Sequence, residues 1–110
     1  MISRTWHGIV PEEHGAEFQE YLNLTGVKEA KEIEGNLGVY VEKVFQDGYY
    51  HFFLCTIWAS WKEIFLYAGK QPQRAISYPE DSQYGLISDP IVAHQEVNNA
   101  SNPFVPQHTI

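Results

Sequence analysis

The chain has 110 residues, of which 44% are hydrophobic and 15% aromatic, enough for one domain with a small core. Its 14 acidic residues outnumber 7 lysines and arginines, giving a formal charge of −7 without a basic stripe, so nucleic acid and anionic membranes are excluded as partners. The chain has a single cysteine, Cys55, so it cannot form an internal disulfide, which suits the cytoplasm. It shows no signal-peptide pattern and no run of roughly 20 apolar residues, so we expect a cytoplasmic protein without a membrane span.

The start of the chain predicts a strand followed by an amphipathic helix. Residues 2–10 are rich in aromatic and β-branched side chains and end at Pro11, which suits the first turn of a helix over 12–24. The buried face of this helix follows i, i+3, i+4, i+7 spacing and consists of Phe18, Tyr21, Leu22 and Thr25. Residues 26–35 are expected to form a short second helical piece or an irregular connection.

A β-hairpin is predicted over 38–46 and 49–58, with its turn at Asp47-Gly48. Both alternating sets of side chains in 49–58 are largely apolar, whereas a sheet with helices on one face alternates apolar and polar residues. Something must therefore cover the second face. In a chain this short we expect a second copy, so the sequence predicts a homodimer packed through its sheet faces.

A second helix is expected over 60–69. Ser60 and Glu63 have the spacing of a capping box, and Gly69 is placed to end the helix. The predicted buried face consists of Trp61, Ile64, Phe65 and Ala68.

A polar connection over 70–89, with one helical turn at 80–84, leads to a last strand at 90–97. The order β-α-β-β-α-β predicts an α+β, ferredoxin-like fold: an antiparallel four-stranded sheet with both helices on one face. In that topology the first strand is central, between the third and fourth strands. We assign residues 1–98 to the domain and residues 99–110 to a C-terminal tail.

No metal site is predicted, because the five histidines form no ligand pattern. Cys55 and His51 are not expected to form a dyad, because four residues of strand separate them by about 13 Å. Glycine-rich phosphate loops are absent from the sequence, so nucleotide binding is not expected.

Strand alternation places Arg4 and Trp6 on one face of the first strand and His7 on the other. An arginine in a central strand is rarely buried without an acidic partner or an anionic ligand. Asp81 and Glu96 are the candidate acidic partners. The alternative left open is that Arg4 makes a structural ion pair and that the aromatic residues form only core.

Five segments together resemble the antibiotic biosynthesis monooxygenase family of the dimeric α/β-barrel superfamily. They are RTWHG at 4–8, GNLGVYVEK at 35–43, TIWASWKEIFLYAG at 56–69, ISYPED at 76–81 and VAHQEV at 92–97. The resemblance implies a ferredoxin-like protomer, a homodimer through the sheets and a pocket between sheet and helices. Relatives include oxygenases that act on activated aromatic molecules without metal or flavin, and haem-degrading enzymes.

The function implied by the resemblance is that of a cofactor-independent monooxygenase acting on a small aromatic or quinol-type molecule. Arg4 would stabilise the substrate anion, and His94 would move the proton. The expected substrate-binding residues are Trp6, Tyr40, Trp58, Trp61, Phe65 and Tyr78. Haem is not expected, because the second helix lacks histidine. The alternative is a non-catalytic ligand-binding or structural protein of the same fold.

Overall fold

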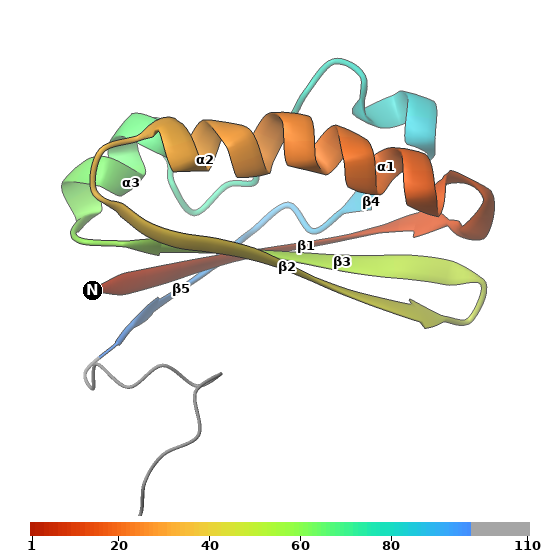
Figure 1. Ribbon diagram of the computed structural model, residues 1–110, viewed down its shortest axis with the longest axis horizontal. Coiled ribbons are helices and arrows are strands. Elements are labelled where there is room, and N and C mark those ends of the chain that lie inside the picture. Colours follow the sequence, from red (N-terminus) through yellow and green to blue (C-terminus); the bar gives the residue numbers. More distant parts are fainter. Residues whose placement is uncertain (98–110) are drawn as a thin grey trace, which may run out of the picture.

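The computed structural model describes residues 1–97, which form one antiparallel sheet covered on one face by helices (Figure 1). The strands are β1 (Ile2–Pro11), β2 (Asn36–Gln46), β3 (Tyr49–Trp58), β4 (Ile87–Ser88) and β5 (Ala93–Glu96). The order is β2-β3-β1-β4, and β5 also pairs with β1. The expected ferredoxin-like α+β fold with a central first strand is confirmed. The assigned tail at 99–110 lies outside the described residues.

The strand expected at 90–97 is shorter, running over β5 (Ala93–Glu96), and a separate two-residue strand, β4 (Ile87–Ser88), precedes it. β4 pairs with Gly8 and Ile9, and β5 pairs with the first half of β1. Between them, residues 90–92 leave the sheet and bond to residues 73–75 instead: the Val92 N–H donates to Gln73 O and the Ala75 N–H donates to Pro90 O. A proline cannot donate to a ladder, which favours this departure at Pro90.

The helix layer on β1 and β3 continues from the helix expected over 12–24 into the short second helical piece, one of the two alternatives for residues 26–35. It runs from a 3₁₀ turn (Glu12–His14) through α1 (Gly15–Leu22) and a π-helical turn (Asn23–Val27) to α2 (Lys28–Glu32). Gly26 does not end the helix, because its missing side chain lets the helix approach the sheet: a Cβ there would lie 2.9 Å from Leu54 Cδ2. The Thr25 hydroxyl donates to the Tyr21 carbonyl inside this turn.

The core lies between this layer and the sheet in two clusters. The larger contains Trp6, Val10, Phe18, Leu22, Val27, Phe52, Leu54 and Val92, and the smaller contains Ile2, Ala30, Trp58 and Ile64. Each large side chain that is fully buried contributes about 1.5–3 kcal/mol to folding. The even-numbered residues of β1 and β3 therefore face the helices, as the predicted alternation requires.

The second helix, α3 (Trp61–Ala68), differs from its predicted packing. Trp61 and Phe65 are 41% and 47% exposed, so placing them on the buried face was wrong; Ile64 is the buried residue, and Tyr67 packs on Trp58 with ring centroids 5.1 Å apart. The buried stripe is therefore rotated from the one predicted. The expected capping box is not formed as such, because the Ser60 hydroxyl donates to the Glu63 carboxylate rather than accepting from the backbone.

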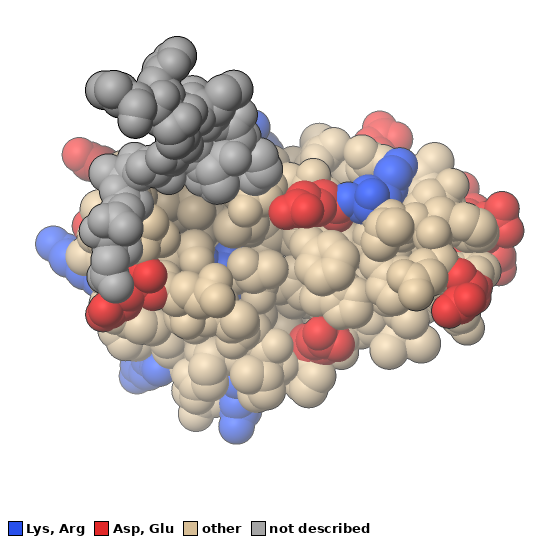
Figure 2. All heavy atoms as spheres, turned by 90° about the horizontal axis from the view of Figure 1, so that it is seen from below, with Lys and Arg blue, Asp and Glu red and all other residues tan. Residues whose placement is uncertain are grey.

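The opposite face of the sheet carries the odd-numbered residues of β1 and β3 and, among residues 1–97, has no helix on it (Figure 1). Uncharged residues make up much of the part of this face that is visible in Figure 2. Here the His7 ring stacks on Phe53, with centroids 4.6 Å apart, and bonds to Asp89 and His51 at 2.9 and 3.0 Å. Within residues 1–97, none of the helices has the length and apolar character that crossing a membrane requires.

Gly8 is required beneath the Trp6 indole. A Cβ at Gly8 would lie 2.4 Å from Trp6 Cζ2, whereas a Cβ at Gly38, in the same sheet, would meet nothing closer than Ile57 Cγ1 at 3.8 Å. We expect Gly8→Ala to lower the free energy of unfolding by about 1–3 kcal/mol through overpacking. Gly38→Ala, the matched control, should be neutral or slightly stabilising. Urea unfolding measures both, and equal effects would contradict the packing described for Trp6.

Candidate functional site

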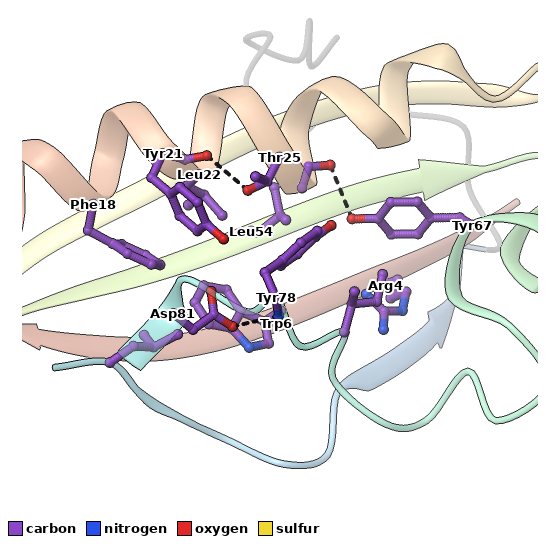
Figure 3. Close-up of a pocket in the computed structure, with 13 residues that line it drawn as sticks. Arg4, Trp6, Phe18, Tyr21, Leu22, Thr25, Leu54, Tyr67, Tyr78 and Asp81 are labelled. Atoms are coloured by element: carbon purple, nitrogen blue, oxygen red, sulfur yellow. Dashed lines mark hydrogen bonds between the residues drawn. The ribbon is translucent and has the colours of Figure 1, made fainter. Parts of the chain in front are cut away.

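A cavity lies between β1, the helix layer and residues 70–86, which we call the strap (Figure 3). Its apolar wall includes Trp6, Phe18, Leu22, Leu54 and Leu86, and its polar groups belong to Arg4, Tyr21, Thr25, Tyr67, Tyr78 and Asp81. The space open to water-sized molecules is about 30 Å³. One water needs on the order of 10–15 Å³ by this measure, so the cavity has room for about two waters.

Arg4 lies at one end of the cavity and is 2% exposed. Its Nη2 donates to the carbonyls of Arg74 at 3.0 Å and Pro72 at 3.4 Å, and its guanidinium carbon lies 5.5 Å from the centroid of the Tyr67 ring. Its Nε is buried and, within residues 1–97, has no hydrogen-bond partner. The guanidinium is thus held by backbone carbonyls and an aromatic face.

Neither carboxylate expected to pair with Arg4 does so. Among the residues that the structure describes, Arg4 forms no ion pair with Asp81, Glu96 or any other acid. Burial lowers the pKa of Arg4, and the nearby Tyr67 and Tyr78 hydroxyls partly offset this. An arginine nevertheless keeps its proton in proteins. The cavity therefore contains a buried positive charge without a described counter-ion, an arrangement that costs stability unless an anion binds there.

The tyrosines around Arg4 remain neutral hydrogen-bonding groups at physiological pH. Burial raises the pKa of Tyr67 to about 12, and burial together with the hydrogen bond to Glu29 raises the pKa of Tyr78 well above its ordinary value. The Tyr67 hydroxyl donates to the carbonyl of Gly26, in the π-helical turn, at 3.1 Å. No phenolate neutralises Arg4 within this group.

Two hydrogen bonds tie the strap to the helix layer, one in each direction. Tyr78 of the strap donates to Glu29 of α2, and Tyr21 of α1 donates to Glu80 of the strap at 3.1 Å. Both contacts are exposed to solvent. The strap is also held by packing, because the Tyr84 ring lies 5.7 Å from that of Phe18 and 4.9 Å from that of Tyr21.

Asp81 begins the 3₁₀ turn η3 (Asp81–Tyr84) on the strap and lines the cavity. Its Oδ2 accepts a hydrogen bond from the Tyr78 N–H at 2.9 Å. The side chain is half-buried, and burial raises the pKa of its carboxyl group. From the sequence it was considered only as a partner for Arg4.

Three of the predicted site residues line the cavity: Arg4, Trp6 and Tyr78. The Trp6 Nε1–H donates to the Ser88 hydroxyl at 2.7 Å, which fixes the indole across the sheet. His7 points to the other face, so the strand divides the RTWHG segment as expected.

The other predicted site residues lie elsewhere. Trp58 is fully buried in the smaller core cluster, and Tyr40 is on the helix-free face, opposite Cys55. The half-buried His94 pairs with Arg4 across β1 and β5, but its ring lies against the exposed Trp61, with centroids 4.9 Å apart and the ring planes tilted by 44°. Trp61 and its neighbour on α3, Phe65, are also outside the lining.

Sequence reasoning missed Tyr67 as a site residue. Its i+3 spacing from Ile64 places it on the buried face of α3, so helical periodicity counted from Ile64 would have found it. Within residues 1–97, no group of three or more His, Cys, Asp or Glu side chains is arranged to hold a metal ion.

The sheet and helix layer define a ferredoxin-like α+β domain. Solved structures of other proteins have a similar fold. A Deinococcus radiodurans protein described as a candidate antibiotic biosynthesis monooxygenase matches 96% of this chain and 100% of its own, with a TM-score of 0.65 at 18% identity. Rv0793 from Mycobacterium tuberculosis matches 92% and 100%, with a TM-score of 0.51 at 15% identity. The chain has the fold of the antibiotic biosynthesis monooxygenase-like proteins.

MupZ from Pseudomonas fluorescens is less similar, with a TM-score of 0.48 at 14% identity over 84% of this chain and 67% of its own. No protein-family model matches the sequence, and no curated protein matches it. The likeness is therefore one of fold.

His94 generates a prediction about pH. Burial, and secondly the positive charge of Arg4, lower the pKa of His94 below its ordinary value of 6.5. The folded state thus favours neutral His94, so its contribution to stability is present above pH 6.5 and is lost as pH falls toward the lower folded value. We expect the His94 imidazole resonance to titrate below pH 6.5 in NMR, and at a higher pH in Arg4→Met.

The same effect is expected in unfolding experiments. The free energy of unfolding of the parent protein should fall more steeply between pH 6.5 and 5.5 than that of His94→Asn. A His94 midpoint at or above pH 6.5 would contradict the burial of its ring nitrogen.

Proposed function

We propose that the protein is a cofactor-independent monooxygenase that binds a small aromatic or quinol-type molecule as its anion in the strap-covered cavity. The observation that carries this proposal is the buried Arg4, which lines an aromatic cavity and has no carboxylate partner among the described residues. The reaction class is supported by the similar fold of the Deinococcus radiodurans protein, which is described as a candidate antibiotic biosynthesis monooxygenase. Trp6 and Tyr78, which line the same cavity, are proposed to contact the ring system of the substrate.

The chemistry demands an acidic phenol or enol. Once deprotonated, the substrate is electron-rich enough to reduce O2; a CH2 group becomes C=O, one oxygen atom enters the product and the other leaves as water. The substrate supplies all four electrons. Arg4 would stabilise the anion on which this reaction depends, in a site where apolar walls strengthen the electrostatic interaction.

Substrate entry requires movement of the strap. An aromatic ligand does not fit into a space of about 30 Å³. The Tyr78–Glu29 and Tyr21–Glu80 hydrogen bonds have carboxylate acceptors, and such bonds each contribute about 1.5–3 kcal/mol. Tyr84 of the strap also packs on Phe18 and Tyr21, with ring centroids 5.7 and 4.9 Å apart, so substrate binding must replace these contacts before the strap closes over the substrate and excludes water.

Anthrone is a suitable test substrate, because it is an aromatic ketone with an acidic CH2 group and an accessible enol. We expect the protein to accelerate O2 uptake with anthrone and Arg4→Met to lower kcat/KM roughly 100- to 1,000-fold, the usual effect of removing one oxyanion-stabilising donor. Arg74→Met removes the same charge from an exposed side chain and should change kcat/KM less than threefold. An oxygen electrode measures the rates.

Full turnover of anthrone by Arg4→Met would remove Arg4 from the mechanism. Saturable binding of anthrone without O2 uptake would instead favour the non-catalytic ligand-binding alternative.

We also propose a homodimer formed through the helix-free face of the sheet. Support comes from the apolar side chains that this face presents, among them Ile9, Phe53 and Ile57, in a chain with no second layer over them within residues 1–97. Packing a second copy of the same face there would bury these side chains in a two-fold interface.

Phe53→Glu should convert the dimer to a monomer, because it places two buried charges in the interface. Leu66→Glu introduces the same charge at a position on α3 that is 65% exposed, and should leave the dimer intact. Sedimentation equilibrium gives the mass, and circular dichroism checks that both variants are folded. A monomeric parent protein would contradict this assembly.

A further inference from the structure

We propose that Asp81 is the general base that removes the proton from the substrate whose anion Arg4 binds. This inference rests on the proposed function and adds the residue that starts the reaction. Arg4 and Asp81 are the two charged side chains among the described residues that line the cavity. One can hold an anion and the other can create it.

The arrangement of the two charges leaves Asp81 available. They form no ion pair, and in Figure 3 Tyr78 lies between them. A salt bridge would hold the carboxylate and weaken it as a base. Because the charges are separated, a ring system can lie along Trp6 and Tyr78 with its oxygen toward Arg4 and its acidic hydrogen toward Asp81.

One oxygen of Asp81 is fixed and the other is unused. Oδ2 accepts the Tyr78 N–H at 2.9 Å, which orients the carboxylate at the start of η3. Within residues 1–97, Oδ1 has no hydrogen bond. This leaves a lone pair for a substrate proton on an oriented group, as general-base catalysis requires.

The groups facing Asp81 favour its function as a base. Tyr21 approaches from α1, Tyr78 and Glu80 belong to the strap, and Arg4 lies across the cavity from β1. Burial and, more weakly, the Glu80 charge raise the pKa of Asp81, although the Tyr78 N–H opposes this. A higher pKa makes the carboxylate a stronger base.

The proton-transfer step is balanced. The C–H or O–H bond of the substrate breaks, its electron pair stays on the substrate as the enolate or phenolate beside Arg4, and the proton forms a bond to Oδ1 of Asp81. No electron transfer occurs in this step, so it can be observed without oxygen.

His94 does not perform this step in the described geometry, because it is absent from the cavity lining and lies on the Trp61 side of Arg4. The role of proton acceptor, which the resemblance implied for His94, is therefore assigned to Asp81.

The test is hydrogen–deuterium exchange at the CH2 group of anthrone in anaerobic D2O, followed by NMR. We expect the parent protein to exceed the buffer rate and Asp81→Asn to lose at least 100-fold of the enzymatic rate, a typical contribution of a general base. Because Asn keeps an oxygen for the Tyr78 N–H, anthrone binding, measured by tryptophan fluorescence, should change less than threefold. Asp89→Asn, on the helix-free face, is the matched control and should exchange like the parent protein.

Two further readouts separate a base from a structural residue. The acidic limb of the exchange rate against pH should disappear in Asp81→Asn. Added acetate should restore exchange in Asp81→Gly, because it supplies a carboxylate in the vacated space, and should not accelerate Asp89→Asn.

The failures can be told apart. Parental exchange in Asp81→Asn, together with O2 uptake by the parent protein, overturns the role of Asp81 and leaves the proposed function standing. If Asp81→Asn fails to fold or to bind anthrone, and acetate does not restore exchange in Asp81→Gly, then Asp81 only stabilises the turn and the inference is overturned. A parent protein that neither binds anthrone nor takes up O2 with it overturns both proposals.

Discussion

The structure around the cavity depends on a positive charge placed where water does not reach it. Arg4 belongs to the central strand, so its side chain has no route to the surface, and it is 2% exposed. Its compensation comes from the carbonyls of Pro72 and Arg74 and from the Tyr67 ring. The first part of the strap and α3 both contact this one guanidinium. Its positive charge has no described carboxylate partner and faces the cavity.

Different elements supply the other parts of the site. The indole of Trp6 extends over a position where only glycine fits, so β1 provides both the charge and an apolar wall. The π-helical turn provides a free carbonyl for Tyr67, a use of helix irregularity that is common at functional sites. The helix-free face is separated from the cavity by the whole sheet. Substitutions in the cavity therefore leave the side chains of the proposed dimer interface unchanged.

The fold followed from local pattern, and the site did so only in part. Alternation in β1 separated Arg4 from His7 correctly, because a period of two has a single solution once one face is buried. The stripe of α3 was misplaced because an eight-residue helix with aromatic residues on several sides has no dominant period, and contact with Trp58 decided its rotation. The partners of Arg4 were backbone carbonyls of residues about 70 positions away, which no side-chain pattern records.

The excursion of residues 90–92 has a mechanical consequence. By bonding to residues 73–75, it fastens the root of the strap to the edge of the domain through Val92–Gln73 and Ala75–Pro90. The carbonyls of Pro72 and Arg74 that hold Arg4 therefore belong to the fastened part of the strap, whereas Tyr78 and η3 lie beyond it. The anion-binding end of the cavity is thus assembled by backbone groups before a ligand arrives.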